Sequence, residues 1–342
     1  MRAIVLGAGV AGLACAVELA ERGVAVEVLE RGERLGSTCC SWYAGGMLAP
    51  WCERESAEPL IAALGRESLE WWPARFPGTV RHGSLVVAHG RDAGELRQFA
   101  RRTEHHQWLE AEAIGSLEPD LAGRFGQALY FPEEGHLDPR AALAALAGRL
   151  AELDAPIRFA VGVERAREQA LMAEAEGSAV VDCRGLAARD ALTDLRGVKG
   201  EMLVVRLPEL NLSRPVRVLH PRVPVYVVPR GDGHYMIGAT MIESDQPTRI
   251  TARSMLELLG AAYALHPAFG EAEIVEIGTG VRPAFPDNLP RVCRVGGTVY
   301  VNGLYRHGFL LAPALARHAA QEVLGTGHSE VTHEDSRQRR LA

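Results

Sequence analysis

The chain has 342 residues, 47% of them hydrophobic and 23% charged, so a large buried core is available and about two domains are expected. The net charge is −6 and the basic residues are scattered, which argues against a surface for nucleic acid or for an anionic membrane. Lys199 is the only lysine, which disfavours Schiff-base chemistry and leaves no lysine for a P-loop.

The six cysteines show no CxxC pair and no metal-like spacing with histidine, and Cys39 and Cys40 are adjacent. Reduced thiols and no metal site are therefore expected. The apolar run Ala3–Val17 imitates a secretion signal, but glycines interrupt it and it is shorter than the ~20 residues of a membrane span. We therefore expect a cytoplasmic protein without a membrane segment.

The first elements form a predicted βαβ unit with parallel strands. A strand at Ala3–Leu6, a helix at Gly12–Arg22 and a strand at Ala25–Leu29 make up this unit. A glycine-rich loop then leads to Pro50, and helical periodicity covers Ser56–Phe76. This opening is typical of a nucleotide-binding fold.

Between this unit and residue 182 the pattern alternates between strands and helices. Asp138 and Pro139 predict the start of an Ala/Leu-rich helix, because aspartate accepts bonds from free first-turn N–H groups and proline has no N–H to leave unpaired there. The other predicted elements are a strand at Ser84–Ala88, a surface helix at Asp92–Glu104, a strand at Gln127–Phe131, and strands at Ile157–Val163 and Ala179–Asp182 that extend the first sheet.

After residue 199 the pattern changes to short strands punctuated by proline and glycine, as in an antiparallel sheet. Parallel strands at both ends of the chain around this block predict an α/β domain interleaved with an antiparallel α+β domain. The elements are strands at Glu201–Leu207, Val216–His220, Val225–Val228 and His234–Ile237, a helix at Ala252–Leu265, strands at Ile274–Thr279 and Val299–Asn302, and a closing helix at Pro313–Leu324.

A GxGxxG motif lies between the first strand and the first helix, the context that dinucleotide binding requires. Gly7 permits the tight turn, Gly9 allows the pyrophosphate to approach the backbone, and Gly12 allows close packing of helix and strand. Glu30 ends the second strand, where a carboxylate can accept from ribose hydroxyls and would repel a 2′-phosphate. The motif predicts a dinucleotide site but does not distinguish FAD from NAD.

Three further segments carry a resemblance to a known family. They are Gly36–Pro50, then Tyr226–Arg230 with Ile237–Met241, and then Gly280–Pro283 with Pro286–Pro290 and Asn302–Pro313. Together with the N-terminal unit they resemble the D-amino acid oxidase superfamily of FAD enzymes, and are most similar to glycine oxidases of the thiamine-biosynthesis type. The resemblance covers essentially the whole chain, in order.

The resemblance implies a Rossmann-like FAD-binding domain interleaved with an antiparallel-sheet substrate domain. The FAD-binding domain would comprise residues 1–80, 138–198 and 275–342, and the substrate domain residues 81–137 and 199–274. FAD would be bound non-covalently, with Val163 holding the adenine by its backbone. Gly308 would begin a helix whose N-terminus can face the flavin and stabilise negative charge on it. The implied cofactor-binding residues are Gly7, Gly9, Val10, Ala11, Gly12, Glu30, Arg31, Gly45, Gly46, Met47, Val163, Gly303, Arg306, His307, Gly308, Phe309 and Leu310.

The resemblance also implies a substrate site. Arg282 would grip the substrate carboxylate with its guanidinium fork, Tyr226 would hydrogen-bond the same group, and Arg306 would lie close by near the flavin. Met241 and Met47 would wall the pocket. The implied reaction removes hydride from Cα of glycine or another small amino acid to flavin N5, with O2 giving hydrogen peroxide and the imine feeding thiazole assembly.

Several alternatives stay open at this point. A sarcosine, proline or D-amino acid oxidase would use the same fold, and a dehydrogenase would pass electrons to a quinone or dye. A flavin domain for tRNA modification is disfavoured by the absence of a basic patch, and an NAD-linked dehydrogenase by the resemblance. We expect a homo-oligomer that takes a small amino acid or amine and O2 and binds neither nucleic acid nor membrane.

Overall fold

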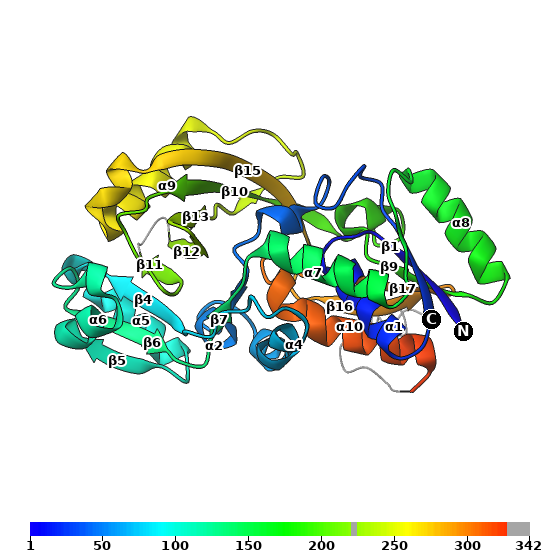
Figure 1. Cartoon of the computed structure of the whole chain (residues 1–342), viewed down its shortest axis with the longest axis horizontal. Coiled ribbons are helices and arrows are strands. Elements are labelled where there is room, and N and C mark those ends of the chain that lie inside the picture. Colours follow the sequence, from blue (N-terminus) through cyan, green and yellow to red (C-terminus); the bar gives the residue numbers. More distant parts are fainter. Residues whose placement is uncertain (220–223, 327–342) are drawn as a thin grey trace, which may run out of the picture.

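The computed structural model describes residues 1–219 and 224–326, in two sheets with helices around them (Figure 1). A six-stranded sheet lies toward the right of Figure 1, and a nine-stranded sheet extends across the left. His220, at the end of one predicted strand, lies outside the described residues. No helix among the described residues is long and apolar enough to cross a bilayer.

The six-stranded sheet is a parallel sheet with one antiparallel edge strand. Its order is β16-β17-β9-β1-β2-β8, and β1 pairs in parallel with both β2 and β9. The predicted parallel pairing of the last strand is confirmed, because β17 pairs with β9. The strands are β1 (Arg2–Leu6), β2 (Ala25–Leu29), β8 (Ile157–Arg158), β9 (Ala179–Asp182), β16 (Arg291–Val295) and β17 (Thr298–Asn302).

Helices cover both faces of this sheet. Successive side chains of β1 point to opposite faces, and each face buries its side chains against helices. Ala3 and Val5 pack into a core shared with three helices, whereas Ile4 and Leu6 face a separate cluster formed with a fourth. The first three are α1 (Val10–Glu21), α7 (Pro139–Glu152) and α10 (Gly308–Leu324), and the fourth is α8 (Val163–Ala175). As predicted, Asp138 caps α7 by accepting from the Arg140 and Ala141 N–H groups, each at 2.8 Å.

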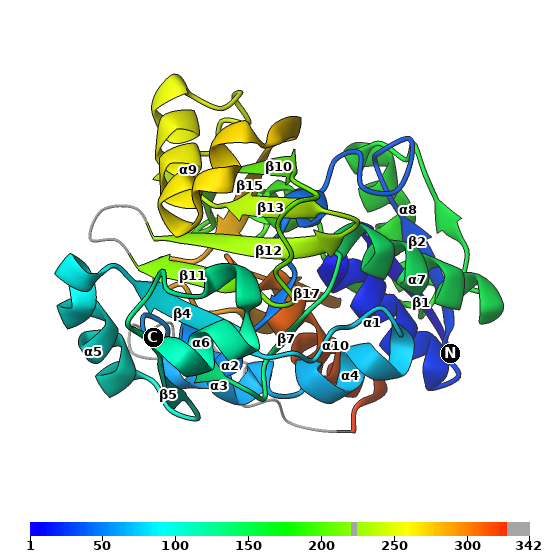
Figure 2. The ribbon, with the colours of Figure 1, turned by 60° about the vertical axis from the view of Figure 1, so that its left-hand side comes forward.

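The nine-stranded sheet is antiparallel except where β11 runs parallel to β4. Its order is β14-β10-β13-β12-β11-β4-β6-β5, and β15 pairs with β10 on the other side. Figure 2 shows helix α9 (Ala252–Leu265) lying over the β10–β13–β12 part. The strands are β4 (Ser84–Ala88), β5 (Gln107–Glu110), β6 (Gln127–Phe131), β10 (Arg196–Arg206), β11 (Val216–Leu219), β12 (Val225–Gly231), β13 (His234–Gly238), β14 (Ile242–Glu243) and β15 (Glu273–Ala284).

Successive side chains of β10 and β12 point to opposite faces of the nine-stranded sheet. One face packs against α9, and the other is turned toward the six-stranded sheet. Leu203 and Val227 belong to the core beneath α9, whereas Met202 and Val228 lie in a small cluster with Tyr226. The remaining elements are a strand pair, β3 (Met47–Leu48) with β7 (Gly135–His136), and helices α2 (Pro50–Glu53), α3 (Pro59–Gly65), α4 (Ser68–Arg75), α5 (Ala93–Arg102) and α6 (Ala111–Leu117). The smaller cavity described below lies on the face with Tyr226.

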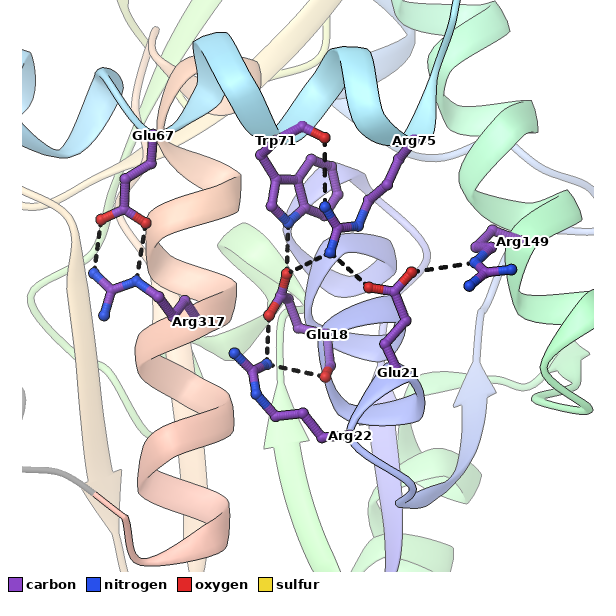
Figure 3. Close-up of polar contacts among 8 residues, drawn as sticks. All are labelled: Glu18, Glu21, Arg22, Glu67, Trp71, Arg75, Arg149 and Arg317. Atoms are coloured by element: carbon purple, nitrogen blue, oxygen red, sulfur yellow. Dashed lines mark hydrogen bonds and ion pairs between the residues drawn. The ribbon is translucent and has the colours of Figure 1, made fainter.

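A polar network ties α1 to the neighbouring helices (Figure 3). The Trp71 indole donates to Glu18 at 2.5 Å, and the Arg75 guanidinium bridges Glu18 and Glu21 at 3.2 and 2.5 Å. Arg149 of α7 reaches Glu21 at 3.1 Å. The helix whose N-terminus faces the glycine loop is therefore held from two sides.

Two element predictions are wrong. The helix expected over Ser56–Phe76 is interrupted between α3 and α4, where the Ser68 hydroxyl donates to the Gly65 carbonyl at 2.6 Å and Gly65 packs directly on Leu310. The strand expected over Ile157–Val163 ends at Arg158, because Ala160 has a positive φ of 57°, and Val163 instead begins α8.

The long ribbon β10–β15 runs across the predicted domain division. Its register pairs Arg196 with Ala284 at one end and Arg206 with Glu273 at the other. The predicted boundaries after residues 198 and 274 therefore fall inside strands. By sheet membership β10 and β15 belong whole to the antiparallel sheet.

Candidate active site

A cavity of about 670 Å³ lies at the carboxyl ends of β1 and β2, where parallel sheets generally bind ligands. Gly7 forms the turn with a φ of +96°, and a Cβ on it would lie 2.9 Å from the Cys183 carbonyl oxygen. A Cβ on Gly12 would lie 1.8 Å from the Gly7 oxygen. Glycine is thus required at both positions for the turn and for close packing of α1.

Glu30 braces the glycine loop from inside the cavity wall. Its Oε2 accepts from the Ala8 N–H at 2.7 Å, and its Oε1 accepts from the Gly32 N–H at 2.8 Å and the Thr38 hydroxyl at 2.7 Å. A carboxylate has about four acceptor positions, so one remains for a ligand hydroxyl. The residue is buried and lines the cavity, as its predicted ribose contact requires.

Replacing Glu30 by alanine is expected to weaken FAD binding by roughly tenfold or more, because three hydrogen bonds that shape the loop are lost. Fluorescence titration of the apoprotein with FAD measures the change. Glu27→Gln, on the same strand, is the control, since Glu27 pairs with the surface arginines Arg2 and Arg158. Equal FAD affinity in the Glu30→Ala variant and wild type would contradict a role for Glu30.

The predicted cofactor residues divide between two adjoining cavities. The larger one is lined by Gly7, Gly9, Val10, Ala11, Glu30, Arg31, Val163 and Gly308. A smaller cavity, of about 110 Å³, is lined by Gly45, Gly46, Met47, Arg306, His307, Gly308, Phe309 and Leu310. Gly308, at the first position of α10, lines both, so this helix N-terminus lies where the cavities meet. Gly12 and Gly303 line neither cavity. At both positions the neighbouring atoms leave no room for a Cβ.

These features fit FAD. The volume suits a large cofactor, the glycine loop opens α1 onto the cavity, and a second helix N-terminus lies at the junction with the smaller cavity. Positive N-terminal ends of helices stabilise negative charge on phosphates or on a reduced ring. Bound there, FAD supplies a two-electron acceptor for substrate oxidation.

The three predicted catalytic residues, Arg282, Tyr226 and Arg306, come together in the smaller cavity. Arg282 lies near the end of β15, Tyr226 lies on the corresponding face of β12, and Arg306 precedes α10. Met47 and Met241 line the same cavity, but Met241 is 52% exposed and lies at the rim. Its sulfur is 3.4 Å from the Tyr305 hydroxyl and 3.6 Å from Arg306.

Glu53 is a buried carboxylate in this cavity that sequence reasoning missed. Its Oε1 accepts from the Tyr226 hydroxyl at 3.0 Å, and its Oε2 lies 2.5 Å from Arg306 and 3.5 Å from His307. Burial alone raises the pKa of Glu53, but the Arg306 guanidinium, with His307 and Arg217, outweighs burial and lowers it to about 2. Glu53 is therefore an anion that neutralises Arg306.

Arg217 is the second residue that was missed. It is buried on β11, its guanidinium lies 5.1 Å from the centre of the Tyr226 ring, and it pairs with Glu55 at 3.5 Å. Burial raises the pKa of Tyr226 above its ordinary value, so its hydroxyl stays protonated. For these two missed residues the sequence offered one signal: Glu53 lies three residues after the Gly36–Pro50 segment that carries the family resemblance.

His307 cannot act as a cation at neutral pH. Burial is the main cause that lowers its pKa to about 4; the nearby arginines Arg306, Arg282 and Arg217 act in the same direction, and Glu53 opposes them. His307 lies directly before α10, at the N-cap position of this helix. At pH 7 the cavity therefore holds a neutral imidazole, one carboxylate and three guanidinium groups.

Arg282 differs from the other two guanidinium groups. Among the described residues, Arg306 and Arg217 have carboxylate partners, whereas Arg282 has none within ion-pair distance. Its Nη1 donates to the Thr240 carbonyl at 3.1 Å. Burial lowers the pKa of Arg282 from its ordinary value. A half-buried, unneutralised guanidinium at the wall of a small cavity is suited to bind a carboxylate.

Behind the site, Glu134 is fully buried beside α2. It accepts from the Cys52 N–H at 2.7 Å and from the Ser84 hydroxyl. Burial nevertheless raises its pKa from 4.5 to about 8. Between these values the unfolded chain has released the proton while the folded chain keeps it, so this group makes the free energy of unfolding fall as pH rises from 4.5 to 8.

Glu134→Gln is expected to remove the contribution that makes the free energy of unfolding fall between pH 4.5 and pH 8. Relative to wild type, the variant should gain several kcal/mol in the free energy of unfolding between pH 5 and pH 8, since one pKa unit corresponds to about 1.4 kcal/mol. Denaturant unfolding at the two pH values measures the difference. Glu133→Gln, an exposed neighbour, is the control. Parallel pH dependence in wild type and Glu134→Gln would refute the burial effect.

The fold and the adjoining cavities define a dinucleotide-dependent oxidoreductase with a small pocket lined by three arginines beside the cofactor cavity. Residues 2–322 match the DAO family, described as FAD dependent oxidoreductase. The chain is 57% identical over 325 residues to a Rhizobium etli protein named "Putative thiamine biosynthesis oxidoreductase ThiO", covering 95% of this chain and 97% of that one. It is 28% identical over 349 residues to a glycine oxidase of Bacillus licheniformis, covering 94% and 92% of the two chains.

A solved structure agrees with these matches. The crystal structure of glycine oxidase from Geobacillus kaustophilus has a TM-score of 0.78 to this chain, with 26% identity over 96% of each chain. The chain therefore belongs to the DAO family of FAD-dependent oxidoreductases. The predicted family, fold class and cofactor are confirmed.

Proposed function

We propose that this protein oxidises glycine, or an amine of similar size, to the imine with O2 as electron acceptor, and that the imine serves thiamine biosynthesis. The observation that carries the proposal is the guanidinium of Arg282, which has no carboxylate partner among the described residues and lies at the wall of a cavity of only about 110 Å³. The names of the relatives from Rhizobium etli and Bacillus licheniformis support the same substrate and pathway.

In this proposal Arg282 carries the main carboxylate contact. The O–H of Tyr226 already donates to Glu53, so a bond from Tyr226 to the substrate requires its hydroxyl to rotate away. Arg306 is likewise engaged with Glu53. A bidentate contact with Arg282 would hold the carboxylate and direct Cα–H toward the junction of the cavities.

No side chain is needed as a general base. Glu53 and His307 are both too weak as bases to deprotonate an ammonium group, because their pKa values are about 2 and about 4. The substrate amine must therefore enter neutral or lose its proton to solvent. The neighbouring apolar residues Met47, Phe309 and Leu310 limit water around Cα.

An oxygen-electrode and peroxide assay tests the proposal with glycine, sarcosine, D-alanine and D-proline. Glycine should give the highest kcat/KM, with one peroxide formed per glycine oxidised. Reduction of a quinone or dye without peroxide would identify a dehydrogenase instead. Preference for sarcosine, D-alanine or D-proline would identify a different amine oxidase. A cytoplasmic location, a homo-oligomeric state and the domain division given above stay predictions.

A further inference from the structure

Strand β10 carries Lys199, Gly200 and Glu201 in succession beneath Arg282. We propose that this tripeptide is a positioning element, which sets the place of the Arg282 guanidinium and thereby the affinity for a substrate carboxylate. The inference rests on the proposed function of Arg282. Lys199 and Glu201 line neither of the two cavities described above, so they would act through other residues.

Gly200 provides the space that the guanidinium occupies. In the β10–β15 ladder Val198 lies opposite Arg282 and Gly200 lies opposite Gly280, so these side-chain positions share the face toward the cavities. A Cβ on Gly200 would lie 2.1 Å from Nη2 and 2.4 Å from Cζ of Arg282. The present position of the guanidinium therefore requires glycine at residue 200.

Lys199 and Glu201 point to the opposite face, beneath α9. Their side chains are 3% and 0% exposed, and the Lys199 Nζ lies 2.6 Å from the Glu201 carboxylate. The same ammonium donates to the Thr248 hydroxyl and the Arg249 carbonyl, each at 3.0 Å, so all three donors are used. A buried ion pair is weak grounds for stability, whereas full satisfaction of its donors fixes geometry.

Thr240 connects this buried pair to Arg282. The Thr240 hydroxyl accepts from the Glu201 N–H at 3.0 Å and lies 3.1 Å from its carboxylate, and the Thr240 N–H donates to the Glu201 carbonyl at 3.2 Å. The Thr240 carbonyl then accepts from Arg282 Nη1 at 3.1 Å. Glu201 holds Thr240 by three contacts, and Thr240 holds one arm of the guanidinium.

The test uses the holoenzyme variants Gly200→Ala and Thr240→Val. Acetate, which carries the carboxylate of glycine without its amine, is titrated while the visible flavin spectrum is followed, and KM and kcat for glycine are measured in parallel. We expect the acetate Kd and the glycine KM to rise by roughly tenfold or more, equivalent to about 1.4 kcal/mol. The content of FAD should be unchanged, and kcat should change less than KM.

Three comparisons separate positioning from general structural damage. Thr240→Ser keeps the hydroxyl and should restore most of the affinity lost in Thr240→Val. Gly260→Ala adds a methyl group in α9, where a Cβ meets no atom within 4 Å, and should bind acetate like wild type. Lys199→Met combined with Glu201→Gln removes both charges of the pair and should weaken acetate binding as Thr240→Val does.

The proposal is overturned if Gly200→Ala and Thr240→Val retain FAD and bind acetate within about twofold of wild type, less than 0.5 kcal/mol. If Gly200→Ala does not fold, Thr240→Val against Thr240→Ser decides. Equal losses in those two would also overturn it. Absence of glycine oxidation by wild type would refute the proposed substrate but not the positioning role, because acetate binding still reports on Arg282.

Discussion

Arg282→Ala is expected to raise KM for glycine by about two to four orders of magnitude while one FAD per chain is retained. Two charge-assisted hydrogen bonds of a bidentate pair contribute about 1.5–3 kcal/mol each, and about 1.4 kcal/mol corresponds to a factor of ten. Neither Arg306 nor Arg217 can replace the lost group, since each already faces a carboxylate. Arg282→Lys should restore only part of the affinity, because an ammonium lacks the planar fork.

Steady-state kinetics with glycine, together with the flavin absorbance of the purified variant, measures both expectations. Arg97→Ala, in the exposed part of α5, is the matched control and should leave KM unchanged. Wild-type kinetics in the Arg282→Ala variant would remove this residue from the substrate site. Loss of FAD together with activity would instead indicate a role in the fold.

Glu53→Gln is expected to change what the pocket accepts. The amide keeps the shape of the side chain but leaves Arg306 without its carboxylate, and Arg217 and Arg282 line the same cavity. With less negative charge among these three guanidinium groups, the pocket should bind a ligand that carries a second carboxylate. Malonate should therefore inhibit the variant roughly tenfold more strongly than wild type, equivalent to about 1.4 kcal/mol, while kcat/KM for glycine falls.

The same substitution should also lower stability. Removing one partner of a buried ion pair typically costs about 3–5 kcal/mol, because the remaining charge stays buried. The Tm of thermal unfolding should therefore fall, and malonate should inhibit more strongly, in the same Glu53→Gln variant. The exposed control Glu58→Gln should show neither change. Unchanged malonate inhibition in a folded Glu53→Gln protein would show that Glu53 does not set the charge of the pocket.

The local patterns in the sequence were sufficient for much of the fold. The glycine motif and the capping of α7 by Asp138 depend on contacts within a few residues, and the succession of strand, helix and strand indicates a parallel pair, so the sequence reveals these features directly. Arg282, Tyr226 and Arg306 were identified through family motifs, and the structure brings them into one cavity. Their roles stay predictions.

Long-range burial accounts for what the sequence did not reveal. In the sequence Glu53 has no feature that distinguishes it from a surface glutamate, and only the folded chain places it beside Arg306. Arg217 lies on β11, whose pairing with β4 depends on tertiary packing. Val163 was assigned to a strand because nothing local marks the positive φ of Ala160 that ends β8. The break between α3 and α4 depends on contact with α10, which is distant in sequence.

The burial of Lys199 has a practical consequence. It is the only lysine of the chain, and it is 3% exposed with every donor occupied. Acylating reagents that target ε-amino groups should spare it in the native protein and modify it only in molecules whose antiparallel sheet has opened. Mass spectrometry of that single adduct would therefore count opening events directly, without competing signals from other lysines.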